Sequence, residues 1–123
     1  MVGWFEIPVT DMSRAQKFYE KVFDIKIHVE HFGKTLMGWF PMPKNPQARG
    51  AGGSLIQNAA HYNPSDNGVL IYFSSSDITT ELDRVEKSGG TVLQQKTLIR
   101  DDIGYMALFL DCEGNRIALH CRP

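Results

Sequence analysis

The sequence predicts an α+β fold in which the order strand, helix and three strands occurs twice. Short segments of alternating or continuous apolar residues, bounded by Pro, Gly, Asn and Asp, are typical of strands. Two further segments carry apolar residues at helical spacing, and each follows an Asp that can cap a helix. The second set of features follows the first at a constant offset, which indicates an internal repeat.

The first half begins with a strand over residues 4–9, W-F-E-I-P-V. A helix follows, with Thr10, Asp11 and Ser13 as candidate N-caps. Strands are expected at 25–32, 35–40 and 54–57, with a Pro/Gly-rich loop at 41–53 before the last of them. The apolar stripe of the helix consists of Ala15, Phe18, Tyr19, Val22 and Phe23.

The second half repeats this order after a linker, N-A-A-H-Y-N-P-S-D-N-G, whose His61 and Tyr62 could reach the cleft of a partner copy, although only their position supports this. A strand at 69–74 precedes a helix capped by Asp77, and Gly89-Gly90 ends that helix. The remaining strands are expected at 91–99, 105–110 and 116–121.

Two subtractions support the repeat: 77 − 11 = 66 for the capping aspartates, and 104 − 38 = 66 for two glycines that each precede an aromatic residue. The sequence is therefore interpreted as one domain over 1–123, with repeat one at about 1–60 and repeat two at about 66–123. The alternative is that two α+β halves resemble each other only through generic patterning.

The composition excludes several classes of function. The 13 basic and 14 acidic residues give a net charge of −1, which favours neither nucleic acid nor an anionic membrane as a partner. No apolar run is long enough to span a bilayer, and no export signal is recognisable at the N-terminus. The two cysteines, Cys112 and Cys121, are expected to be free thiols, which favours a cytoplasmic location.

Four motifs carry a resemblance to a known family: V-T-D-M-S-R-A-x-x-F-Y at 9–19, the helix start at Asp77, the helix end at Gly89-Gly90, and D-x-E-G-N-R at 111–116. With the tandem βαβββ order, the chain resembles the vicinal oxygen chelate superfamily, which includes glyoxalase I, extradiol dioxygenases and bleomycin-resistance proteins. It is most similar to small glyoxalase-like proteins that begin with a W-F-E-I-P-V strand.

The resemblance implies an eight-stranded pair of half-barrels that encloses a cleft, with the helices outside. It also implies a homodimer, in some members with exchanged halves, and a small-molecule ligand. In the family's enzymes four strands supply His, Gln or Glu ligands to a divalent metal. The corresponding positions here are Trp4, either Ser54 or Gly52, Leu70, and Ala118.

Trp4, Leu70 and Ala118 offer no side-chain donor to a divalent ion, so no cofactor is expected. A divalent metal in a shifted site remains an alternative, with Glu6 and His120 as ligands and either Tyr72 or a group of the fourth strand completing the set.

Strand alternation then identifies the candidate site. Trp4 and Glu6 share one face of the first strand, and Tyr72 and His120 lie on the corresponding faces of theirs. We expect Glu6 to act as a general base, with Tyr72 or His120 hydrogen-bonded to it. Tyr72 would polarise a carbonyl or stabilise an enolate, and His120 would act as acid or set the charge on Glu6. Burial would raise the pKa of the Glu6 carboxyl and hydrogen-bond donors would lower it. The expected substrate-binding residues are Trp4, Trp39 and Leu70.

Three functions fit these residues. The first is metal-independent proton transfer on a small carbonyl compound, an activity of the lyase or isomerase type. The second is a non-catalytic protein that sequesters a small molecule. The third is a lyase or dioxygenase with the shifted metal site. The structural alternatives are a Glu6–Tyr72 pair that merely satisfies itself, an idle His120, and a Trp39 that belongs to the core.

Overall fold

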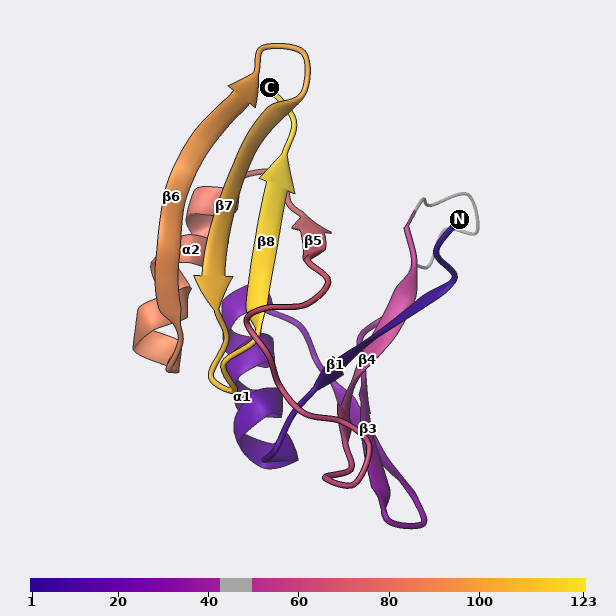
Figure 1. Cartoon of the computed structure of the whole chain (residues 1–123). Helices are drawn as coiled ribbons and strands as arrows, with labels where there is room; N and C mark the ends of the chain where they lie inside the picture. The colour runs from indigo at the N-terminus through magenta and orange to yellow at the C-terminus, as the bar shows by residue number, and fades with distance from the viewer. Residues whose placement is uncertain (43–49) are drawn as a thin grey trace.

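A computed structural model describes residues 1–42 and 50–123, and the order of elements confirms the predicted α+β fold (Figure 1). The two halves have the same arrangement. The first comprises β1 (Trp4–Pro8), α1 (Met12–Phe23), β2 (His28–Phe32), β3 (Thr35–Trp39) and β4 (Gly52–Gln57). The second comprises β5 (Ile71–Ser74), α2 (Ile78–Val85), the 3₁₀ turn η1 (Glu86–Ser88), β6 (Thr91–Arg100), β7 (Gly104–Leu110) and β8 (Arg116–Cys121).

Neither α-helix in these described ranges has the length and apolar character needed to cross a bilayer.

Three strand starts differ from the predicted ones by two residues or more. β2 begins at 28 instead of 25, because the backbone N–H groups of Ile25 and Ile27 donate to the backbone and side chain of Glu20. β4 begins at Gly52, two residues early, and the Phe5 ring lies where a side chain on Gly53 would be. β5 begins at 71, so Leu70 precedes it. Of the loop predicted at 41–53, residues 43–49 lie outside the described residues.

Each half forms its own four-stranded mixed sheet. The strand orders are β1-β4-β3-β2 and β5-β8-β7-β6, with β1 parallel to β4 and β5 parallel to β8. Figure 1 shows the two sheets diverging from each other, with α1 near their junction. The sheets are not joined into a closed barrel, since β1 and β5 are edge strands that each have one strand partner among the described residues.

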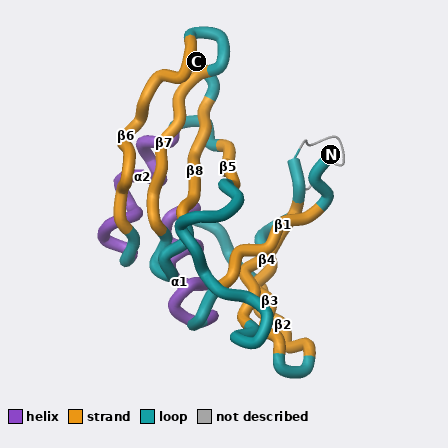
Figure 2. The backbone as a smooth tube through the Cα atoms, viewed as in Figure 1, coloured by secondary structure: helices purple, strands orange, loops and turns teal. Residues whose placement is uncertain are grey.

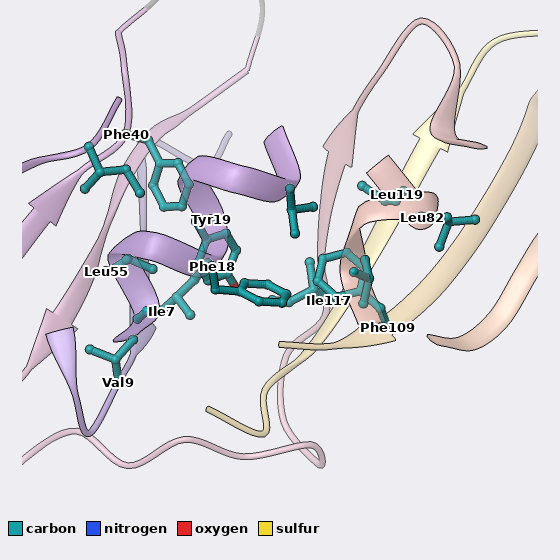
Figure 3. Packing of buried hydrophobic residues seen from close by; sticks show 14 of the residues in the cluster. Ile7, Val9, Phe18, Tyr19, Phe40, Leu55, Leu82, Phe109, Ile117 and Leu119 are labelled. Atoms are coloured by element: carbon teal, nitrogen blue, oxygen red, sulfur yellow. The ribbon is translucent and has the colours of Figure 1, made fainter. Parts of the chain in front are cut away.

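One hydrophobic core nevertheless joins the two halves through α1 (Figure 3). The Phe18 ring packs against Phe109 of the second half, with 6.1 Å between ring centroids. The adjacent Tyr19 packs against Phe40 of the first half at 5.5 Å. Aromatic burial of this kind stabilises a fold by roughly 1.5–3 kcal/mol per side chain, so α1 holds both sheets in place.

The turn between β7 and β8 fastens the halves with hydrogen bonds. Glu113 accepts from the backbone N–H groups of Thr10 and Asp11 at 2.7 and 3.0 Å. The buried Tyr19 hydroxyl donates to Oδ2 of Asp111 at 2.6 Å. Burial raises the pKa of Tyr19 well above its usual value, and the Asp111 carboxylate raises it further. The D-x-E-G-N motif therefore has a structural use in this chain.

Candidate functional site

A cavity of about 1050 Å³ lies between the edge strands of the two sheets. Residues of β1 and β5, of the segment before β5 and of the start of β8 line it. Figure 2 shows the long linker that leads from β4 to β5, and its residues Asn63, Ser65 and Gly68 also reach the cavity. This volume is at the upper end of the range usual for small-molecule sites, about 300–1,000 Å³.

Alternation along β1 gives Glu6 a different environment from its neighbours. Ile7 and Val9 are buried in the core, whereas Glu6 is half-buried. Glu6 lines the cavity, as do the other residues of β1. The hydroxyl of Tyr62 donates a hydrogen bond of 3.0 Å to Oε1 of Glu6. That hydrogen bond and the negative charge of Glu6 raise the pKa of Tyr62. The hydrogen bond from Tyr62, a residue of the linker, therefore fixes the position of the Glu6 carboxylate.

Tyr72 and His120 are placed differently from each other. Tyr72 lines the same cavity as Glu6, with half of its surface exposed. His120 lies on the same face of its sheet, one register step from Tyr72, but its ring hydrogen-bonds the carbonyl of Ile103 at 2.8 Å. His120 is not among the cavity-lining residues that the structure describes. The hydrogen bond to Glu6 that was expected from Tyr72 or His120 is therefore made by Tyr62.

A row of polar side chains crosses the first sheet beside Glu6. In the strand register Glu6 is opposite Ser54, and Ser54 is opposite Trp39. The Ser54 hydroxyl and the Trp39 indole nitrogen are buried, and neither has a hydrogen-bond partner among the described residues. Buried polar groups are almost always satisfied, so these two unpartnered donors are exceptions, and neither Ser54 nor Trp39 lines the cavity.

The three residues expected to bind substrate fall into two groups. Trp4 and Leu70 line the cavity. Trp39 does not line it, but its ring meets the ring of Trp4 edge-on, with 5.3 Å between centroids. Trp39 therefore packs against Trp4 without lining the cavity itself.

The residues at the family's ligand positions do not fit a divalent metal. Trp4 is opposite Gly52 in the register, and Ala118 is opposite Tyr72 and fully buried. With Leu70, these positions provide no donor beyond the hydroxyl of Ser54. Across residues 1–42 and 50–123, no three His, Cys, Asp or Glu side chains come together as a metal site.

Sequence reasoning missed two groups at the site: Tyr62, which hydrogen-bonds Glu6, and Arg116, which lines the cavity. Tyr62 lies in a linker without periodicity, so no signal in the sequence could place it. Arg116 could have been found, because it is two residues before Ala118 on the same strand and shares its face.

Comparison with known proteins agrees with this architecture. Residues 1–119 match the model of the glyoxalase/bleomycin resistance protein/dioxygenase superfamily. A glyoxylase-like domain-containing protein from Didymella fabae is 28% identical over 126 residues, which cover 99% of this chain and 94% of the relative.

Solved structures show the same fold. A glyoxylase/bleomycin resistance protein/dioxygenase domain from Frankia sp. EAN1pec has a TM-score of 0.76 at 16% identity, covering 100% of this chain and 98% of its own. A glyoxalase/bleomycin resistance protein from Albidiferax ferrireducens T118 has a TM-score of 0.72 at 19% identity, covering 100% and 99%.

Glyoxalase I from Zea mays has a TM-score of 0.70 at 19% identity, with 96% of this chain covered. The match spans 44% of the maize chain, so this chain is less than half its length. The family match over residues 1–119 and the doubled βαβββ arrangement lead to one conclusion: the chain belongs to the glyoxalase/bleomycin resistance protein/dioxygenase superfamily.

Proposed function

We propose that the protein catalyses metal-independent proton transfer next to the carbonyl group of a small molecule, with Glu6 as the base. The observation that carries the proposal is a carboxylate, held by Tyr62, on the wall of a ligand-sized cavity. A base must lie within hydrogen-bond reach of the proton it removes, and a substrate in this cavity can bring its carbon to the free oxygen of Glu6.

The proposed step is an enolisation. The C–H bond next to the carbonyl breaks, its proton goes to Glu6, and the electron pair moves onto the carbonyl oxygen. The hydroxyl of Tyr72, which lines the same cavity, donates a hydrogen bond to that oxygen. Return of the proton from Glu6 to another carbon completes an isomerisation. Return to the same carbon, after Glu6 has exchanged its proton with solvent, completes a hydrogen exchange. Trp4 and Leu70 hold the apolar part of the substrate.

His120 enters the proposal as the acid only if its ring leaves the carbonyl of Ile103. Replacement of His120 by Gln is therefore expected to change turnover less than replacement of Glu6 or Tyr72.

The test is deuterium exchange of a panel of small ketones and aldehydes, followed by NMR in D₂O. Glu6→Gln should reduce any exchange by about 10²- to 10⁴-fold, the usual contribution of a general base. The matched control is Glu86→Gln, which changes an exposed carboxylate away from the cavity. Exchange that survives Glu6→Gln unchanged would eliminate Glu6 as the base.

A second function, non-catalytic binding and sequestration of a small molecule, is favoured by the apolar walls. Trp4, Leu70 and Tyr72 provide the surface that an aromatic or amphipathic ligand needs. This function predicts tight binding without turnover, and binding that Glu6→Gln leaves intact. Thermal-shift screening of both proteins against one ligand panel separates the two functions.

The proposal includes no resident metal, because the donor set at the family positions does not suit one. The alternative is a lyase or dioxygenase whose divalent ion is held in a shifted site by Glu6 and His120. Elemental analysis of the purified protein decides between them: stoichiometric Zn, Mn, Ni or Fe would favour the shifted site.

We also propose that two copies form a homodimer in the cytoplasm. The open edges of β1 and β5 are available for pairing with a second copy, and the two free cysteines agree with a reducing compartment. Light scattering after size-exclusion chromatography tests the dimer, and imaging of a tagged chain tests the location.

A further inference from the structure

We propose that Arg116 is the anion-binding residue of the cavity and that the ligand is a small monocarboxylate with an apolar body. This inference deepens the proposed function, on which it rests: the carboxylate pairs with Arg116 while the carbonyl-bearing part of the same molecule faces Glu6.

The position of Arg116 follows from the register of the second sheet. Arg116 opens β8, and on this strand Arg116, Ala118 and His120 share a face. Ala118 is opposite Tyr72, so Arg116 lies one step along the same face from Tyr72. Its side chain is half-buried and lines the cavity.

Arg116 is the only cationic residue among the cavity-lining residues within 1–42 and 50–123. None of the ion pairs in these ranges includes it, and its guanidinium makes no hydrogen bond there. A half-buried guanidinium with its donors unused is suited to an anion, because five N–H groups in a fixed plane match a carboxylate in a bidentate manner.

None of the nearby acids forms an ion pair with Arg116 among the described residues, so none of them takes the place of a ligand anion. Glu81, which also lines the cavity, accepts from the Ser75 hydroxyl at 3.0 Å. Glu6 accepts from Tyr62. Asp111, in the turn before β8, is buried and accepts from Tyr19 and Asn115.

The balance of charges also limits the ligand. Among the described residues that line the cavity there are one guanidinium, that of Arg116, and two carboxylates, those of Glu6 and Glu81. A second negative charge on the ligand would meet these carboxylates without a cation of its own, and like charges in a partly buried site repel. The cavity therefore favours a monocarboxylate over a dicarboxylate or a phosphate ester. The apolar body would contact Trp4 and Leu70.

The two tryptophans of the chain provide the readout, since Trp4 lines the cavity and Trp39 contacts Trp4. Two probes of equal shape are 4-oxo-4-phenylbutanoate and its uncharged primary amide, titrated against tryptophan fluorescence. Wild type should bind the acid about tenfold or more tighter than the amide, as expected when a charged hydrogen-bond pair is gained.

Arg116→Gln should weaken acid binding to the level of the amide and leave amide binding within about twofold of wild type. Arg116→Lys should keep part of the preference for the acid, since it retains the charge but loses the planar guanidinium. The matched control, Arg122→Gln, removes an exposed arginine outside the cavity and should match wild type. Melting temperatures establish that each variant is folded.

The proposal is overturned if wild type shows no preference for the acid, which includes binding neither probe at millimolar concentration. It is also overturned if Arg116→Gln weakens acid and amide equally, because Arg116 would then act through structure. Failure of the enolisation function is distinguishable from these results. Glu6→Gln would then leave deuterium exchange unchanged while the preference for the acid persists and still depends on Arg116.

Discussion

The hydroxyl of Tyr62 lies 3.0 Å from Oε1 of Glu6 and donates a hydrogen bond to it, joining the linker to the first strand. Tyr62→Phe removes this bond without changing the ring. We expect the free energy of unfolding, measured by urea denaturation, to fall slightly, and any Glu6-dependent turnover to fall as well. Equal turnover in wild type and Tyr62→Phe would mean that Tyr62 has no part in positioning the base.

The same pair makes a titration prediction. The hydrogen bond to Glu6, together with the charge of Glu6, raises the pKa of Tyr62. Replacement of Glu6 by Gln removes the charge and should lower the pKa of Tyr62 toward its ordinary value. NMR of ¹³C-labelled tyrosine follows the titration, with the other three tyrosines as internal references. An unmoved Tyr62 signal would show that the pair does not form in solution.

Substitution of Ser54 tests whether a water or ligand oxygen is bound to its buried hydroxyl. Its hydroxyl is fully buried without a partner among the described residues, a situation that costs about 1–3 kcal/mol. Ser54→Ala should therefore leave the free energy of unfolding unchanged or raise it by about 1 kcal/mol. Ser76→Ala, at an exposed position, is the control. A clear loss of stability in Ser54→Ala would instead reveal a tightly bound water or ligand oxygen.

Glu113 should make stability depend on acid pH. Burial by itself raises its pKa, but hydrogen bonds from Arg14 and from the backbone of Asp11 and Thr10 outweigh burial and lower the pKa to about 2. A lowered carboxyl pKa contributes stability above the unfolded value of 4.5. That contribution disappears as the pH falls from about 4.5 through about 2.

Glu113→Gln tests this contribution. The variant should be less stable than wild type by about 1–3 kcal/mol at pH 7, with the difference shrinking between pH 4.5 and pH 2. Denaturation midpoints at several pH values measure it, and Glu86→Gln is the exposed control. A difference that stays constant with pH would contradict an ionised, paired Glu113.

Both cysteines should be unreactive in the folded protein. Burial raises the pKa of Cys112 to about 12, with a further contribution from its hydrogen bond to Glu113, and Cys121 is 3% exposed. Since the thiolate is the reactive form, a thiol reagent at pH 7.5 should label neither residue quickly and both after unfolding. Rapid labelling of the native chain would indicate that the β7–β8 turn opens readily.

Local sequence signals were sufficient for most of the fold. Asp11 and Asp77, matched by the offset, both cap their helices by accepting from a backbone N–H at 3.1 Å. Gly38 and Gly104 occupy equivalent positions in the two halves, but glycine is required at each for a different reason. A side chain on Gly38 would press against Ile27 and Met12, whereas Gly104 has a φ of +110° that L-residues rarely adopt. A repeat predicts where such residues lie, and only packing explains why each is needed.

The candidate site was partly predictable for the same reason. Alternation along β1 predicts that Glu6 leaves the core, because Ile7 and Val9 must enter it. The path of the linker decides that Tyr62 reaches Glu6, and such a path depends on contacts far apart in sequence. Whether the hydroxyl of Ser54 finds a partner depends on atomic distances that no pattern of residue types encodes.

The position of α1, packed against both sheets, has a consequence for the stability of each half of the chain. Phe18 faces the second sheet and Tyr19 hydrogen-bonds the turn after β7, so neither repeat retains a complete interior when alone. Each half therefore depends on the other for its folding. Separately produced fragments, cut within the linker, should each be poorly folded and should regain structure only when mixed.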